Sequence, residues 1–386
     1  MNGNKRLLST ISTILAALIC VVIGLAIGFV ILVILALMAK AGGEESYTFG
    51  EVVAQAYNSG FKQILLGGLY RLPSVRQVRS ELALAAPLIM CGLSVGFAFK
   101  TGLFNIGAAG QYCLGAYGGL LCALVFKLPW WLCLIASALF GAVWGAIPGF
   151  FKAYFNINEV ITSIMFNWIG LYGVNTLIYA NGNGAMYCAK TTKTWTINSQ
   201  NPSGVIPDLS KISDVFKNPA TIAIFIAAFM AIVLYVVLSK TVFGYELKAC
   251  GFSKTAARYA GINEKRNIIL SMTIAGGLAG LGAGLYYLTD VLQWQPLVST
   301  ALPGMGFDGI SVALLASSDP IGTILSALLI SHISTGGGLM DASLFPPEIA
   351  DVISGVIIYL CAFMMLFKTS IGKLLFRKAM KEGDKR

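Results

Sequence analysis

The chain has 386 residues, of which 57% are apolar and 11% are charged, and its formal net charge is +10. Soluble domains average about 25% charged residues, so this composition excludes a soluble protein and predicts an all-α integral membrane protein surrounded by lipid. The basic residues are spread over loops and the C-terminal tail with few aromatic neighbours. This pattern is typical of cytoplasmic loops and argues against nucleic-acid binding.

Residues 1–40 predict a retained N-terminal transmembrane helix. The uncharged run from Leu7 to Ala39 is longer than the roughly 7–15 apolar residues of a signal peptide. Residues 41–81 carry too many charges for a membrane span, and we expect them to form an amphipathic connection on the outer surface.

Residues 82–370 are predicted to form the main transmembrane domain, followed by a basic cytoplasmic tail at residues 371–386. The apolar runs predict about ten spans, at residues 11–39, 82–99, 107–127, 130–151, 158–180, 219–239, 267–289, 306–317, 320–336 and 348–368. The short eighth and ninth spans are expected to be half-helices or a re-entrant pair. An even number of spans places both termini on one side, and the basic tail makes that side cytoplasmic. The Lys and Arg residues within 40–80, which this topology places outside, argue against it.

Two motifs resemble catalytic signatures without their required partners. Gly92-Leu-Ser94-Val-Gly96 matches the nucleophile elbow of hydrolases, but it lies within a span and His332 is the single histidine of the chain. We interpret these small residues as helix contacts, as we do Gly141-x3-Gly145 and Gly276-x3-Gly280. The segment 184–191 approaches a phosphate-binding loop but lacks the second glycine. No metal site is expected, because the eight cysteines include no Cys-x-x-Cys pair.

Polar residues within the spans are informative, because each costs free energy unless it is satisfied. Asn105 and Gln111 flank a glycine-rich run that predicts a broken or bent helix. Glu159 is expected to lie favourably at a helix N-terminus. Asp308 is interpreted either as a functional group or as a helix N-cap, and His332 as a packed, hydrogen-bonded side chain.

The predicted cytoplasmic loop 240–266 reads as a short helix in which small and basic residues alternate. It is either an ordinary basic loop or a docking helix that fits a groove on a partner protein.

Four segments in this order are similar to one known family. Phe243–Gly251 with Ala256–Asn263, Gly102–Gly107, Asn158–Met165 and Gly306–Ile310 together resemble permeases of ABC importers for branched-chain amino acids, simple sugars and nucleosides. They are most similar to nucleoside permeases that work with a lipoprotein of the basic-membrane-protein type. The chain departs from the pattern at Ala109, where the family usually has glutamate, and at Ser317-Ser318.

The resemblance implies a permease subunit that is not itself an enzyme and binds no cofactor, with ATP on a partner subunit. The implied partners are an ATP-binding cassette ATPase, a second homologous permease in a heterodimer, and an extracytoplasmic substrate-binding lipoprotein. The implied location is a bacterial cytoplasmic membrane. The ATPase-coupling residues are expected to be Gly244, Ala249, Ala256, Ala257, Arg258, Ala260, Gly261 and Ile262. The expected substrate pathway comprises Asn105, Gln111, Asn167, Asp308, Phe104, Phe166 and Trp168.

Three alternatives remain open from the sequence. The same importer architecture serves simple sugars as well as nucleosides. A self-contained secondary transporter would show internal repeats and mid-membrane carboxylates, and neither is evident. A membrane-embedded enzyme would need a nucleophile–base pair, which a single histidine makes difficult.

Overall fold

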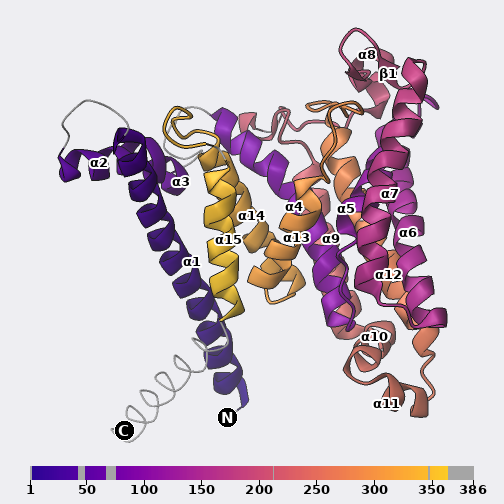
Figure 1. Ribbon diagram of the computed structural model, residues 1–386. Coiled ribbons are helices and arrows are strands. Elements are labelled where there is room, and N and C mark those ends of the chain that lie inside the picture. The colour runs from indigo at the N-terminus through magenta and orange to yellow at the C-terminus, as the bar shows by residue number, and fades with distance from the viewer. Residues whose placement is uncertain (1, 42–47, 67–74, 212, 347, 364–386) are drawn as a thin grey trace, which may run out of the picture. The chain divides into compact units, whose positions relative to one another are not determined.

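Helices dominate the structure, because a helix satisfies its own backbone hydrogen bonds where no water is available. The computed structural model describes residues 2–41, 48–66, 75–211, 213–346 and 348–363 (Figure 1). The chain divides into two compact units, residues 1–72 with 332–386 and residues 73–331. Each of the ten predicted membrane segments overlaps a helix, and residues 364–368 of the tenth lie outside the described part of the chain.

The first unit is built from the two ends of the chain. It contains α1 (Asn2–Ala41), α2 (Phe49–Gln55), a π-helical turn (Ala56–Phe61), α3 (Lys62–Leu66), the end of α14 (Pro320–Gly337) and α15 (Ile349–Ala362). Helix α1 packs closely on α15, since a Cβ on Gly24 would lie 2.4 Å from Ile357 Cγ1. His332 Nε2 lies 3.1 Å from the Leu65 carbonyl oxygen, which confirms the prediction of a hydrogen-bonded histidine.

The connection 41–81 contains short helices, and residues 67–74 lie outside the described part of the chain. Helix α4 begins at Val75, seven residues before the predicted second span, which starts at residue 82. The mean hydropathy of residues 75–81 is lowered by Arg76, Arg79 and Glu81, although these residues form the first turns of α4. Arg79 Nε donates a hydrogen bond to the Asp214 carbonyl oxygen.

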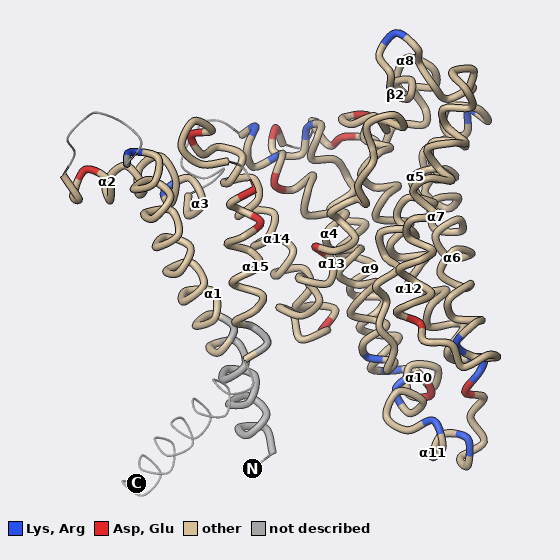
Figure 2. The backbone as a smooth tube through the Cα atoms, viewed as in Figure 1, with Lys and Arg blue, Asp and Glu red and all other residues tan. Residues whose placement is uncertain are grey.

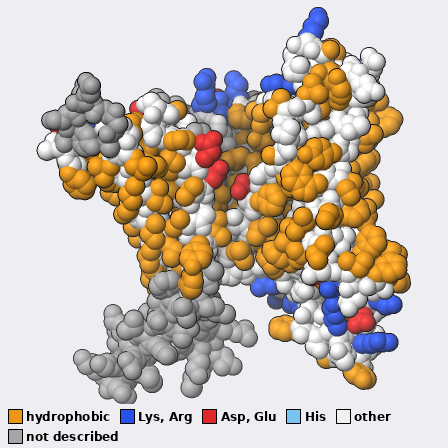
Figure 3. Space-filling model, viewed as in Figure 1, with side chains coloured by type: hydrophobic (Ala, Val, Ile, Leu, Met, Phe, Trp, Pro, Cys, Tyr) orange, Lys and Arg blue, Asp and Glu red, His pale blue; other side chains and the backbone are white. Residues whose placement is uncertain are grey.

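The second unit packs its helices around α4 (Val75–Lys100) and α12 (Glu264–Tyr287). The most apolar windows of these two helices have 78% and 67% of their residues buried, against 28% in α6 (Trp130–Phe155) and in α9 (Ala223–Lys240). The unit also contains α5 (Ala108–Leu124), α7 (Glu159–Tyr179) and α13 (Gly304–Leu315). Hydrophobic side chains cover the middle of its visible face, and Lys and Arg side chains gather at its ends (Figure 3).

Glycine contacts between spans confirm the helix-packing interpretation. A Cβ on Gly276 of α12 would lie 2.3 Å from the Gly141 carbonyl oxygen of α6. Ser94 lies on α4 and donates a 2.6 Å hydrogen bond to the Ala275 carbonyl oxygen of α12, so it is a helix contact and not a nucleophile elbow.

The two ends of the second unit carry different loops. One end carries a hairpin of β1 (Tyr187–Cys188) and β2 (Lys193–Thr194), in which Tyr187 pairs with Thr194, and the short helix α8 (Ile197–Gln200). The other end carries α10 (Val242–Phe252) and α11 (Lys254–Tyr259) (Figure 1). Lys and Arg residues cluster around α10 and α11 along the backbone trace (Figure 2).

Among the described residues, six helical segments are long and apolar enough to cross a membrane. They are Leu18–Lys40, Val75–Lys100, Trp130–Phe155, Glu159–Gly182, Ala223–Lys240 and Glu264–Tyr287. The count of ten crossings therefore stays a prediction, with the shorter helices Gly304–Leu315 and Ile349–Leu360 as further candidates.

Candidate functional site

The chain leaves the helical conformation between α4 and α5, as the glycine-rich run predicts. Gly102 has φ +73°, a conformation that favours glycine, and Leu103 N donates a 2.9 Å hydrogen bond back to the Ala98 carbonyl oxygen. Helix α5 resumes at Ala108. We call residues Thr101–Gly107 the α4–α5 break.

Asn105 lies in this break and forms a reciprocal amide pair with Gln111 of α5. Its Nδ2 donates to Gln111 Oε1 at 2.7 Å, and Gln111 Nε2 donates to Asn105 Oδ1 at 2.9 Å. Asn105 Nδ2 also lies 3.0 Å from Ser94 Oγ. All three side chains are fully buried, and Ser94 continues the network to α12. The network therefore ties the break to α4, α5 and α12.

Asn167 of α7 holds the start of α5. Its Oδ1 accepts a 2.8 Å hydrogen bond from Gly110 N, and its Nδ2 donates a 3.0 Å bond to the Ile106 carbonyl oxygen. The first backbone N–H groups of a helix lack partners within the helix, so Asn167 caps α5 from a neighbouring span. Asn105, Gln111 and Asn167 all have their amide groups engaged with protein atoms in this conformation.

The predicted aromatic pathway residues form ring contacts and are not members of this hydrogen-bonded network. Phe104 stacks on Phe99, with ring centroids 4.9 Å apart. Phe166 is half-buried and packs against Trp144, whereas Trp168 is 41% exposed and stacks on Tyr172 at 5.9 Å.

Asp308 is exposed in the second turn of α13. Pro303 is the N-cap of that helix, so the N-cap interpretation of Asp308 was wrong.

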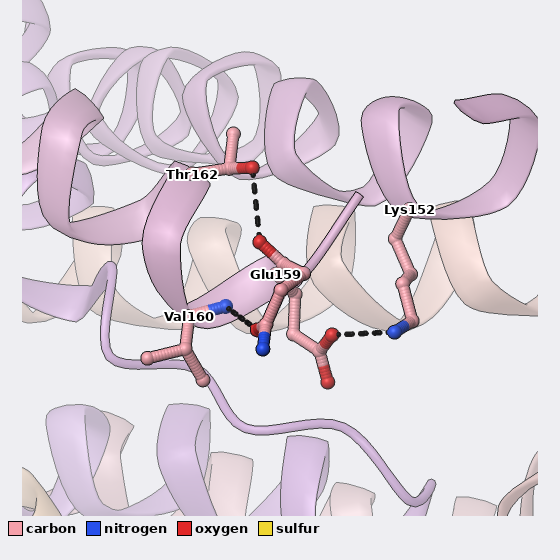
Figure 4. A network of polar contacts seen from close by, with 5 residues as sticks. Lys152, Glu159, Val160 and Thr162 are labelled. Carbon is pink, nitrogen blue, oxygen red and sulfur yellow. Dashed lines mark hydrogen bonds and ion pairs between the residues drawn. The ribbon is translucent and has the colours of Figure 1, made fainter. Parts of the chain in front are cut away.

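The N-terminus of α7 contains a compact polar cluster (Figure 4). Asn158 caps the helix by accepting a 2.9 Å bond from Val160 N, and Thr162 Oγ1 donates to the Asn158 carbonyl oxygen at 3.1 Å. Glu159 lies in the first turn, as predicted, and pairs with Lys152 of α6 at 2.9 Å. A carboxylate is favourable there because it also complements the helix dipole.

The predicted coupling segment forms two short helices with defined ends. Thr241, Ser253 and Asn263 cap α10, α11 and α12 by accepting backbone N–H bonds of 3.1 to 3.2 Å. The predicted ATPase-coupling residues differ in their exposure to solvent. The exposed ones are Ala256, Arg258, Ala260 and Gly261, the half-buried ones are Ala249 and Ile262, and the buried ones are Gly244 and Ala257.

Sequence reasoning missed the aromatic side chains of this α10–α11 loop. Phe252 and Tyr259 are 92% and 90% exposed, and Tyr245 is also exposed. The sequence signal that could have identified them is the presence of large aromatic residues within a short basic loop.

Comparison with known proteins extends these observations. A family model described as "Branched-chain amino acid transport system / permease component" matches residues 79–362. The nucleoside ABC transporter permease protein NupB of Lactococcus lactis subsp. cremoris is 34% identical over 347 residues, covering 86% of this chain and 93% of that protein. The guanosine ABC transporter permease protein NupP of Bacillus subtilis is 32% identical over 369 residues, covering 94% and 97%. The guanosine ABC transporter permease protein NupQ of the same organism is 28% identical over 259 residues, covering 65% of this chain and 78% of that protein.

Proposed function

Because the chain belongs to the family of branched-chain amino acid transport system permease components, we propose that it is the membrane-spanning subunit of an ATP-driven nucleoside importer. The chain is a multi-pass membrane transport protein and not an enzyme. The observation that carries the nucleoside assignment is its similarity to NupB and NupP over almost their whole lengths.

We assign the α10–α11 loop as the docking surface for an ATPase subunit. Exposed Phe252 and Tyr259 offer large apolar area beside basic residues, and buried aromatic side chains dominate the energy of many interfaces. The capped helices keep this surface ordered before a partner binds, which reduces the entropy lost on association. This end of the unit, with its Lys and Arg residues, would face the cytoplasm.

The remaining partners follow from the same assignment. Bacillus subtilis has two guanosine permeases that resemble this chain, NupP more fully than NupQ. A heterodimer with a second, NupQ-like permease therefore fits this chain. An external binding lipoprotein would deliver the nucleoside.

The outward face of α7 is the best-supported part of the substrate pathway. Helix α7 has 21 residues and so spans about 31 Å, which places Trp168 and Tyr172 roughly 14 and 20 Å from its start, near mid-membrane. Within the described residues, neither the Trp168 indole N–H nor the Tyr172 hydroxyl donates a hydrogen bond to protein. Polar groups facing lipid at that depth are unfavourable, whereas a water-filled pathway would satisfy them.

The exposed face of α6 provides the contrast. Its Trp131 and Tyr154 lie at the two helix ends, and the exposed residues between them include Ile135, Leu139 and Val143. This is the pattern of a helix facing lipid, with aromatic residues at the interfaces. The mid-membrane pair on α7 departs from it, and stacked aromatic rings suit the flat face of a nucleobase.

The proposal is tested by uptake of radiolabelled guanosine in cells that lack the gene and in cells where it is restored, with the cognate ATPase active or inactivated. We expect uptake only when both proteins function. Trp168→Ala should raise the guanosine KM by about tenfold, since base stacking on an aromatic ring contributes about 1–3 kcal/mol. Trp131→Ala is the matched control and should leave KM unchanged.

Two results would contradict the assignment. Guanosine uptake that does not depend on the gene, while the ATPase still copurifies with the chain, would retain the importer and make a simple sugar the substrate class. Uptake that survives ATPase inactivation but collapses with an ionophore would establish a secondary transporter.

A further inference from the structure

A cavity of about 170 Å³ lies at the end of the second unit that carries α10 and α11. Three segments line it: the α4–α5 break, the end of α10 with the residues that follow it, and the first turns of α12. On one side Gly102 and Gly251 are in backbone contact, since a Cβ on Gly102 would lie 2.4 Å from Gly251 Cα. The volume has room for roughly five water molecules at about 30 Å³ each, so the cavity is larger than a packing defect.

Two buried polar side chains of α12 line this cavity with unused hydrogen-bonding capacity. Asn267 and Ser271 are 3% and 1% exposed and lie one turn apart on the same face of the helix. Among the described residues, none hydrogen bonds to the Ser271 hydroxyl or donates to Asn267 Oδ1. Asn267 Nδ2 has two long contacts, 3.5 Å to Glu246 Oε2 and 3.6 Å to Cys250 Sγ. Buried polar groups are normally satisfied, so these atoms indicate an occupant that hydrogen bonds.

The rest of the wall is apolar inside and charged outside. Leu103, Leu247 and Ile268 are buried, whereas Phe252 and Lys254 line the cavity and are exposed, so they lie on its solvent side. Lys254 forms no ion pair with the residues that the structure describes. A mostly apolar wall with a few placed polar groups is typical of a small-molecule site. This wall fits a flat ligand with apolar faces and hydrogen-bonding edges, whose anionic part stays outside near Lys254.

We infer that this cavity is a second binding site of the chain, which takes the base of a purine nucleoside or of its 5′-monophosphate. An asparagine amide matches the hydrogen-bonding edge of adenine, and an exposed aromatic ring such as Phe252 stacks on a base. A two-ring base fits the volume, and the ribose and phosphate project toward Lys254. The choice of a purine rests on the proposed nucleoside import, because imported nucleosides and their phosphates reach this cytoplasmic face.

Occupation of the site has an expected consequence for transport. A bound base contacts the α4–α5 break, α10 and α12 at once, so it opposes any change in their spacing. We therefore expect import to slow as the nucleoside or its monophosphate accumulates on the cytoplasmic side. The site would act as a product sensor on the permease itself.

Binding is tested on the full-length chain in lipid nanodiscs with radiolabelled guanosine 5′-monophosphate. All variants carry Trp168→Ala, which removes base stacking at the proposed pathway. Ser271→Leu fills the cavity and should weaken binding tenfold or more, and Ser271→Ala, which removes one hydrogen bond, about threefold to tenfold. Ser137→Ala is the matched control, because the Ser137 hydroxyl of α6 is also buried without a partner among the described residues, and should bind as the parent does.

Three results would overturn the inference. No binding to the parent chain, or equal affinity in Ser271→Leu, would mean that the cavity holds water only. Ribose 5-phosphate binding as tightly as the nucleotide would mean that Lys254 attracts an anion and that no base is recognised. If Ser271→Leu does not fold, photolabelling of the wild-type chain with 8-azidoadenosine 5′-monophosphate decides. The label should map to residues 101–107 or 247–271, and a label found only elsewhere would overturn the site.

The effect on transport is measured with the complete importer in proteoliposomes whose lumen faces the ATPase. Guanosine 5′-monophosphate loaded with ATP in the lumen should lower the initial rate of guanosine uptake in the wild type and leave it unchanged in Ser271→Leu. Equal rates with and without the luminal nucleotide in the wild type would overturn the product-sensing role. Absence of guanosine uptake without the nucleotide would contradict the proposed function instead, and the binding measurement would then decide the cavity on its own.

Discussion

The buried network around Asn105 and the exposed α10–α11 loop use their side chains in opposite ways. Asn105 and Gln111 are fully buried and satisfy each other, so their contribution is to the stability of the spans. Phe252 and Tyr259 are almost fully exposed and contact little of the chain, so their contribution is expected in association. The contrast teaches that polar residues between and within the spans can satisfy their hydrogen bonds inside the protein, and that an apolar residue in a loop need not belong to a core.

The largest expected effect is on stability, from Asn105→Ala. The change leaves both polar atoms of the buried Gln111 amide without their partner, at about 1–3 kcal/mol for each unsatisfied group. We expect a clear fall in the thermal unfolding midpoint of the purified protein. Asn198→Ala is the control, because Asn198 is exposed on α8 and its loss should cost less than about 0.5 kcal/mol. Equal unfolding midpoints for the two variants would contradict a stabilising role of the buried network.

The next effect is on association, from Phe252→Ser combined with Tyr259→Ser. Loss of two exposed aromatic side chains should weaken ATPase binding about tenfold or more, as at other interfaces, with the unfolding midpoint unchanged. Binding of the purified ATPase by surface plasmon resonance measures this. Trp195→Ser, which removes an exposed aromatic side chain near the hairpin, should leave the affinity at its wild-type value. An unchanged affinity in the double variant would contradict docking at this loop.

The ion pair between Lys152 and Glu159 should have a smaller effect on the free energy of unfolding. Its side chains are 17% and 13% exposed, between the fully buried Asn105 and the almost fully exposed Phe252. A double-mutant cycle with Lys152→Met and Glu159→Gln isolates the interaction between the two charges. We expect a coupling free energy of about 1 kcal/mol in chemical unfolding. Strictly additive single effects would mean that burial does not strengthen this pair.

The smallest effect concerns Asp208 in the loop after α8. Its pKa is lowered, chiefly by the hydrogen bond from the Ser210 hydroxyl at 2.9 Å. A lowered pKa means that the carboxylate stabilises the folded loop above its ordinary value, near pH 4, and that this contribution is lost as pH falls through the lowered value. Proteolysis of the loop by pepsin should therefore accelerate as the pH is lowered below about 4. Asp208→Asn should remove that dependence, and an unchanged pH profile would contradict the assignment.

The sequence predicted the helical segments well, because long apolar runs and positive-inside charge are local signals. The predicted second span begins at residue 82, after the start of α4 at Val75, because Arg76 and Arg79 lower the hydropathy of residues that are nonetheless helical. The sequence identified Asn105 and Gln111 as special but not as partners of each other. Their pairing depends on the geometry of the α4–α5 break, which side-chain spacing alone does not specify.

The α10–α11 loop was likewise predicted only in part. The short helical character of residues 240–266 was predicted from alternating small and basic residues, whereas the exposure of Phe252 and Tyr259 depends on how α10 packs on α9 and α12. The contact between Gly102 and Gly251 joins segments far apart in the chain, and no local pattern indicates it.

The central claim is that the chain moves nucleosides at the expense of ATP hydrolysed by a partner. The most direct measurement is guanosine accumulation in proteoliposomes that contain the complete importer, with ATP or a non-hydrolysable analogue, and with or without an ionophore. The account predicts accumulation against a gradient that requires ATP hydrolysis and is insensitive to the ionophore. Accumulation that proceeds with the analogue, or that collapses with the ionophore, would contradict it.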